Sequence, residues 1–249
     1  MSDEHANTVN KPYTIKRDFK DIRKVRQDNN NKLVYDAIIS NNIKELYKNI
    51  NIKEFERTLI DLQKTKEQFL QKCIEDNDFC KLASRNISIN SSRQGAKDET
   101  VQIQTCNLTA KKCGLIVSNL SATDLRPTKY GSIISKKEMN QQQIQKDCCL
   151  KSFDGKISGR VNGYIAAKIA YGAGGHQDNV FEEMDTIADW WKKYKSETLE
   201  ILVILIETDL KEKFDRLNTK YINLDNIFVF NHIEFQQYMI DKYYKEESV

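Results

Sequence analysis

The segment Tyr164–Gly175, YIAAKIAYGAGG, is an apolar run with a single charged residue, Lys168, and it ends in a glycine-rich break. A short apolar run that stops at turn residues predicts a buried strand. After the break, apolar side chains recur at helical spacing from about Gln177 to Lys193, which predicts an amphipathic helix. Together the two patterns predict a strand that leads directly into a helix and carries one lysine.

The flanking sequence extends this pattern in both directions. On the N-terminal side, Asp154-Gly155 is a turn pair between apolar residues, which indicates a hairpin or a bent strand. On the C-terminal side, predicted strands and helices alternate, at 199–206 (buried strand), 210–221 (helix), 227–230 (buried strand) and 234–244 (helix). This alternation predicts an α/β fold, with a mixed central sheet flanked by helices and parallel pairing among its later strands.

The N-terminal third has a different character. We expect residues 1–30 to form a flexible basic arm, residues 31–85 a helical N-terminal region, and residues 86–249 the α/β core. In the helical region, apolar residues recur at spacings of three, four and seven, which predicts two helices joined near residues 49–51. The segment 101–104 alternates like a strand but equally fits the start of a helix.

Composition favours a soluble, cytoplasmic protein without membrane association. The longest apolar run in the 249 residues, 199–206, is far too short to span a bilayer, and the polar N-terminus does not resemble a signal peptide. The six cysteines include no C-x-x-C pair, so we expect reduced thiols rather than a zinc site. The net charge of +3 permits nucleic-acid binding without requiring it. A basic run in the N-terminal arm is either solvated or in contact with a DNA backbone; it comprises Lys16, Arg17, Lys20, Arg23, Lys24 and Arg26.

Asp154 and Lys168 suggest a particular chemistry. Hydrolysis of a phosphodiester requires a cation that neutralises the phosphate, oxygen ligands that hold this cation, and a positive group near the attacking water. A carboxylate at a bent strand and a lysine on the next strand supply two of these groups. Asp154 lies at the predicted hairpin, and Lys168 follows fourteen residues later on the apolar strand.

This arrangement resembles that of the PD-(D/E)XK nucleases, whose best-known members are the type II restriction endonucleases, over roughly residues 150–240. The resemblance implies a restriction-endonuclease-like fold, a Mg²⁺ cofactor and cleavage of double-stranded DNA. The chain departs from the family pattern at Ala166, because family members carry Glu or Asp two residues before the lysine. Some members instead supply a glutamate from the following helix, about thirteen or fourteen residues after the lysine.

Glu182 and Glu183 are therefore alternative metal ligands beside Asp154. The spacing from the lysine favours Glu182. Helix geometry favours Glu183, because at ~100° per residue it lies on the flank of the apolar stripe while Glu182 points away from it. A third explanation is that Ala166 is an engineered replacement of a native glutamate.

Further residues are candidates for DNA contacts. The segment Gly174–Asn179 starts the helix after the lysine strand, where free backbone N–H groups suit a phosphate; the alternative is a glycine linker with a helix cap. Glu99 is either an additional acid near the metal or part of a surface loop. The candidate DNA-binding residues are Arg93, Lys97, Arg126, Lys129, Arg160, His176, Gln177 and Asn179.

The resemblance leads us to expect a type II restriction endonuclease. Asp154 and one of the two helix glutamates would hold Mg²⁺, and Lys168 would orient or help deprotonate the attacking water. One active site cuts one strand, so we expect a symmetric homodimer on a palindromic site. The alternatives are a structure-specific repair nuclease, a non-catalytic DNA-binding protein on a degenerate nuclease fold, and an α/β protein whose glycine loop binds a small anion.

Overall fold

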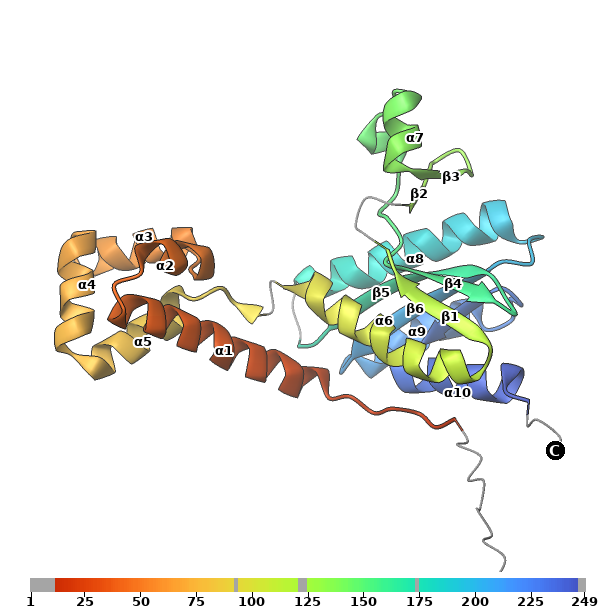
Figure 1. Ribbon diagram of the computed structural model, residues 1–249. Helices are drawn as coiled ribbons and strands as arrows, with labels where there is room; N and C mark the ends of the chain where they lie inside the picture. Colours follow the sequence, from red (N-terminus) through yellow and green to blue (C-terminus); the bar gives the residue numbers. More distant parts are fainter. Residues whose placement is uncertain (1–11, 92–93, 121–124, 173–174, 246–249) are drawn as a thin grey trace, which may run out of the picture. The chain divides into compact units, whose positions relative to one another are not determined.

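The computed structural model describes residues 12–91, 94–120, 125–172 and 175–245 (Figure 1). The chain forms two compact units, one of residues Asp18–Gly95 and the other of Met1–Arg17 together with Ala96–Val249. The first unit is helical and the second is α/β with a mixed sheet flanked by helices, which confirms the expected fold class. Among the residues just given, no helix is long and apolar enough to cross a membrane.

The helical unit contains five helices over its described residues, where the sequence predicted two. They are α1 (Phe19–Ile39), α2 (Ile43–Asn49), α3 (Ile52–Asp61), α4 (Lys66–Glu75) and α5 (Asn77–Ile87). The additional helices are short and begin at polar caps, such as the capping box in which Thr65 and Gln68 bond each other's backbone. Their core holds edge-to-face contacts of Phe69 with Phe55 and Phe79.

The expectation of a flexible arm over residues 1–30 is wrong for the residues from Phe19 onward. These residues lie in α1, which begins there because the side chain of Asp18 accepts hydrogen bonds from the N–H groups of Lys20 and Asp21. The expected boundary at residue 86 is also displaced, because residues 86 and 87 belong to α5 and the two units divide at Gly95.

Residues 13–17, which precede α1, are bound to the α/β unit by hydrogen bonds to their backbone. Gln236, a fully buried residue, accepts from the N–H of Ile15 at 2.8 Å and donates to its carbonyl at 3.0 Å. Thr109 donates to the carbonyl of Tyr13, and the N–H of Arg17 donates to Nε2 of His232. Two hydrogen bonds join the backbone of this segment to one buried carboxamide. The segment is therefore held on the α/β unit and is not a solvated arm.

The sheet of the α/β unit has the order β1-β4-β5-β6-β7. The strands are β1 (Leu115–Asn119), β4 (Gly155–Gly159), β5 (Gly163–Ala170), β6 (Ile201–Thr208) and β7 (Ile227–Phe230). The pairs β1–β4 and β4–β5 are antiparallel, whereas β5–β6 and β6–β7 are parallel. The parallel strands are connected by α8 (Gly175–Lys195) and α9 (Lys211–Tyr221), as parallel pairing requires.

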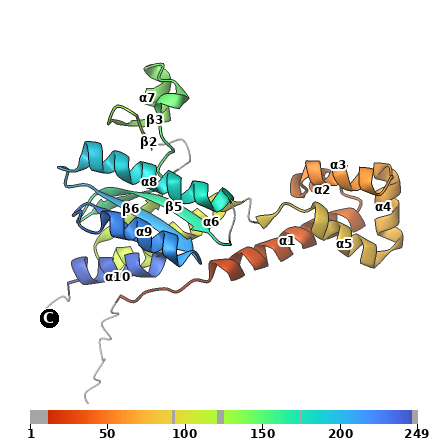
Figure 2. The ribbon, with the colours of Figure 1, turned by 180° about the vertical axis from the view of Figure 1, so that it is seen from behind.

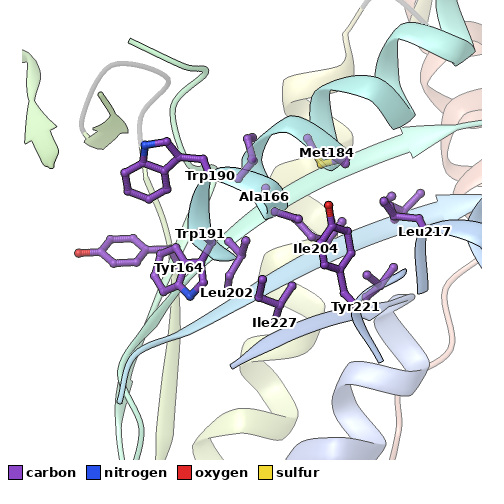
Figure 3. Packing of buried hydrophobic residues seen from close by; sticks show 14 of the residues in the cluster. Tyr164, Ala166, Met184, Trp190, Trp191, Leu202, Ile204, Leu217, Tyr221 and Ile227 are labelled. Carbon is purple, nitrogen blue, oxygen red and sulfur yellow. The ribbon is translucent and has the colours of Figure 1, made fainter. Parts of the chain in front are cut away.

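Helices cover both faces of this sheet. In Figures 1 and 2, α6 (Gly95–Lys112) and α10 (His232–Tyr243) lie on one face, and α8 and α9 on the other. Residues of β6 alternate between two buried clusters. Leu202 and Ile204 belong to the cluster that contains Trp191 of α8 (Figure 3), and Val203 belongs to the cluster that contains residues of α6 and α10. Burial on both faces explains why this strand is continuously apolar in sequence.

A small insertion separates β1 from β4. It contains the hairpin strands β2 (Leu125–Pro127) and β3 (Ile133–Ser135), helix α7 (Lys136–Gln141) and a 3₁₀ turn at Lys146–Cys148. β2 and β3 form a separate two-stranded sheet, which stands apart from the main sheet in Figure 1. The sequence pattern did not predict these elements, since each is only three to six residues long.

The close approach of β5 and β6 predicts the effect of Gly163→Ala. A Cβ at Gly163 would lie 2.3 Å from the carbonyl oxygen of Ile201, its partner in the parallel register. We expect the free energy of unfolding, measured by urea denaturation, to fall by about 3 kcal/mol, because backbone atoms must shift. Gly95→Ala is the control, since a Cβ there meets no atom within 4 Å. Equal stability of the two variants would contradict this account.

Candidate active site

Asp154 lies immediately before β4 and is held by three hydrogen bonds. Its N–H donates to the carbonyl of Ile165 and its carbonyl accepts from the N–H of Leu120, both at 2.8 Å. Its Oδ2 accepts from the N–H of Ala167 at 2.8 Å. The residue therefore bridges the end of β1 and the middle of β5, and its carboxylate is fixed against the β5 backbone.

Lys168, on β5, points its ammonium group at oxygen atoms of three residues. Its Nζ donates to Oε1 of Glu99 at 2.5 Å and to the carbonyl of Ala167 at 2.7 Å, and it lies 3.4 Å from Oδ2 of Asp154. An ammonium group has three hydrogens, so these three acceptors match its capacity. The side chain is only 9% exposed, and the structure thus brings Asp154 and Lys168 together around a buried charge.

Glu99 is the second carboxylate at this site and comes from α6. The sequence left it open whether Glu99 was an acid near the metal or part of a surface loop, and whether segment 101–104 was a strand or the start of a helix. The segment is helical, and Glu99 falls in line with the buried residues Ile103, Cys106 and Ala110 at helical spacing. This periodicity could have placed Glu99 on the buried face of α6.

Burial and neighbouring charges shift the ionisation of both partners. Burial, with a further contribution from the charge of Glu99, raises the pKa of Asp154 from 3.8 to about 6, against the opposing effects of Lys168 and the Ala167 N–H. Burial acts to lower the pKa of Lys168, but the charges of Asp154 and Glu99 outweigh it and raise that pKa above its usual value. The lysine is therefore held in its ammonium form.

Glu183, on α8, is the helix glutamate that belongs to this site. Its charge contributes to raising the pKa of Lys168. Its Oε2 accepts a hydrogen bond from Lys151 at 2.7 Å, while its Oε1 is buried and has no hydrogen-bond partner among the residues that the structure describes. A buried carboxylate oxygen without a partner is costly unless a ligand satisfies it. Lys151 was not singled out in the sequence, where nothing marks it among the other lysines.

Glu182 and Ala166 complete the comparison with the family pattern. Glu182 is exposed and lines a groove between α8 and α9, beside Lys213 and Lys220. Ala166, two residues before Lys168, is 1% exposed and packs in the same cluster as Met184 of α8 (Figure 3). Of the two alternatives, Glu183 is the one whose charge acts on Lys168, and Ala166 lies in an apolar environment.

The oxygen atoms of the site are suitable ligands for Mg²⁺. In the parts of the chain described above, no group of three or more His, Cys, Asp or Glu side chains is arranged to hold a metal. Mg²⁺, however, is usually bound by one or two carboxylates, and water and phosphate oxygens complete its shell. Asp154 and Glu99 share one ammonium group, and the partnerless Oε1 of Glu183 is a third carboxylate oxygen. Carboxylate oxygens are the type of ligand that a hard divalent cation prefers.

The candidate DNA-binding residues are spread over the α/β unit. Lys97 on α6, Lys129 beside β2 and Asn179 on α8 are exposed, and Arg126 in β2 is half-buried. Arg160 follows the end of β4 opposite to Asp154 and donates to the carbonyl of Tyr243 at 2.5 Å, so the structure does not bring it to the site. Arg93, and the side chains of His176 and Gln177, lie outside the described residues.

Comparison with known proteins gives no assignment. No protein-family model matches the chain, and no curated protein or solved structure is significantly similar to it.

The raised pKa of Asp154 predicts how stability depends on pH. Because the pKa in the folded state, about 6, exceeds the ordinary value, ionisation of this carboxyl opposes folding. The destabilisation is absent below about pH 4 and develops as the pH rises to 6. The Asp154→Asn variant has no carboxyl group at this position and so is not destabilised in this way. The difference in the free energy of unfolding, variant minus parent protein, should therefore rise by up to about 3 kcal/mol between pH 4 and pH 7. Urea denaturation across this range tests it; a difference that stays constant with pH would contradict it.

Proposed function

We propose that this protein is a Mg²⁺-dependent endonuclease that cleaves double-stranded DNA, of the type II restriction kind. The observation that carries the proposal is the contact of the buried Lys168 ammonium with the carboxylates of Glu99 and Asp154. A cationic group and carboxylate oxygens in one place are what phosphodiester hydrolysis requires. Structural ion pairs also perturb pKa values, so the assignment is tested below by activity.

The order of elements around the site supports the same proposal. Helix α6 is followed by the antiparallel strands β1, β4 and β5, then by α8 and the parallel strand β6. In this order Asp154 precedes the second strand and Lys168 lies on the third, the placement in which the sequence resembled the PD-(D/E)XK nucleases.

Each residue of the site has a role in this proposal. Asp154, Glu99 and Glu183 would hold Mg²⁺ through carboxylate oxygens. The bound ion would neutralise the phosphate and acidify its water. Lys168 is held as an ammonium group, so it orients the attacking water and stabilises the negative charge of the transition state. Its raised pKa disfavours the alternative role of accepting the proton of that water.

A non-catalytic DNA-binding protein is the second candidate. It is favoured by one observation, the presence of buried Ala166 at the position of the family's strand carboxylate. The two candidates differ in one respect that can be measured, because the second predicts retention of DNA without cleavage. Cleavage of both strands by a protein with one site per chain would also require a homodimer, which remains part of the proposal.

Digestion of unmethylated plasmid and phage DNA tests the proposed activity. With Mg²⁺, we expect discrete, reproducible fragments on a gel, and none with EDTA or with Lys168→Met, which keeps the length of the side chain but removes its charge. Circular dichroism would check that the variant is folded. Intact DNA across several sequences and divalent metals, from a folded protein that still retains DNA, would instead establish the second candidate.

The two neighbouring glutamates of α8 provide a matched pair of variants. We expect Glu183→Gln to lower the cleavage rate at least about 100-fold and to raise the Mg²⁺ concentration needed, since groups that only orient a metal ligand typically account for about 10–100-fold. Glu182→Gln, on the exposed face of the same helix, should stay within about twofold of the parent protein. The reverse result would assign the ligand to Glu182, and two unaffected variants would exclude a helix ligand.

A further inference from the structure

The insertion between β1 and β4, defined as residues 125–153, carries an excess of positive charge. It contains six basic and two acidic side chains, a net charge of +4 over 29 residues, whereas the whole chain has a net charge of +3. One of the two acids, Glu138, caps α7 by bonding the N–H and hydroxyl groups of Ser135. The positive charge of the insertion is therefore largely uncompensated by its own acids.

The basic side chains of the insertion are mostly exposed. Five of the six are exposed, Lys129, Lys136, Lys137, Lys146 and Lys151, and the sixth, Arg126, is half-buried. They come from four parts of the insertion: the β2–β3 turn, α7, the 3₁₀ turn and the segment before β4. These exposed lysines give the insertion a positively charged surface, which suits a polyanion.

The insertion is firmly attached to α8. Nε1 of Trp190 donates to the carbonyl of the buried residue Thr128 at 2.6 Å, and the hydroxyl of Tyr194 donates to the carbonyl of Lys129 at 3.0 Å. Leu125 and Leu150 also pack against the core cluster that contains residues of α8. A charged surface held by buried contacts can define the position of a ligand, which a tethered loop cannot.

The base of the insertion borders the candidate active site. The chain passes from Phe153 directly to Asp154, and Lys151 forms the ion pair with Glu183. The lysines of the insertion and the carboxylates of the site therefore belong to one unit of the protein, and α8 contacts the insertion through Trp190 and Tyr194 and carries Glu183.

We propose that this insertion binds the phosphate backbone of the duplex whose scissile phosphate lies at the Asp154–Lys168 site. The inference rests on the proposed function for the identity of its ligand. The lysines supply the electrostatic, sequence-independent part of the affinity, and the attachment to α8 fixes the duplex relative to the site carboxylates. DNA is favoured over an acidic protein because the charge adjoins a site suited to phosphodiester chemistry.

Two variants with equal charge test the proposal. The first replaces four lysines of the insertion, K129Q/K136Q/K137Q/K146Q, and the second replaces four exposed lysines elsewhere, K44Q/K53Q/K111Q/K211Q. None of these residues belongs to the candidate active site, and their exposure makes correct folding the expectation, checked by thermal melts. Binding of a fluorescent 30-base-pair duplex is measured by anisotropy in EDTA between about 50 and 200 mM salt, and cleavage of plasmid DNA is measured with Mg²⁺.

The insertion variant should bind the duplex at least about tenfold more weakly, and the slope of log affinity against log salt should become shallower by about 3. The control should keep the parent slope to within about 1. At low salt, the control variant should cleave plasmid DNA at the rate of the parent protein, because none of its four lysines lies in the insertion. Binding without cleavage by the parent protein would refute the proposed function, but a weaker binding of the duplex by the insertion variant would still support the contact of the insertion with the phosphate backbone.

Three outcomes would overturn the inference. The first is parent affinity and parent salt slope in the insertion variant, as expected if the patch serves an acidic protein. The second is equal weakening by the control variant, which would indicate a general effect of net charge. The third is a parent protein that does not bind the duplex at all.

Discussion

The contacts of the buried ammonium group of Lys168 join the elements of the candidate site within the α/β unit. They draw together three elements that are distant in sequence, since Glu99 comes from α6, Asp154 from the bend before β4, and the lysine from β5. A buried charge is tolerated only where counter-charges and hydrogen bonds satisfy it. The Ala167 carbonyl and N–H complete the set, and so the β5 backbone fixes both the lysine and the aspartate.

Ala166 stands where the PD-(D/E)XK pattern has Glu or Asp, and its presence is consistent with this organisation. Residues 166 and 168 share one face of β5 by the alternation of a strand, and the space at Ala166 is filled by apolar side chains that include Met184. Glu183 lies one residue before Met184, on the flank of the same helix, and so it carries a carboxylate towards Lys168 without displacing the core. A glutamate on the helix thus contributes negative charge at Lys168 while Ala166 keeps the core apolar.

The central part of the fold could be predicted from sequence, whereas the periphery could not. Long apolar runs predicted β5 and β6, which are buried on both faces, and a 3.6-residue period predicted α8, which is long and buried along one face. The elements α2, α7 and β2 are only three to seven residues long, too short for a period to be recognised. Lys168 was identified because it is the single charged residue in an apolar strand, and Asp154 because it lies at the turn that precedes this strand. Lys151 could not be identified, since only its contact with Glu183 distinguishes it.

The energetics of the site argue for function rather than for stability. Three carboxylates, Asp154, Glu99 and Glu183, are gathered near two lysines, and burial raises the pKa of Asp154 to about 6. A protein selected only for stability would gain by replacing such a group with apolar side chains, since buried ion pairs seldom improve on them. The partnerless Oε1 of Glu183 adds a further cost that no contact within the described residues repays. Costs of this kind are typical of sites that are completed by a ligand, and a cation held among the carboxylates would offset the repulsion between them.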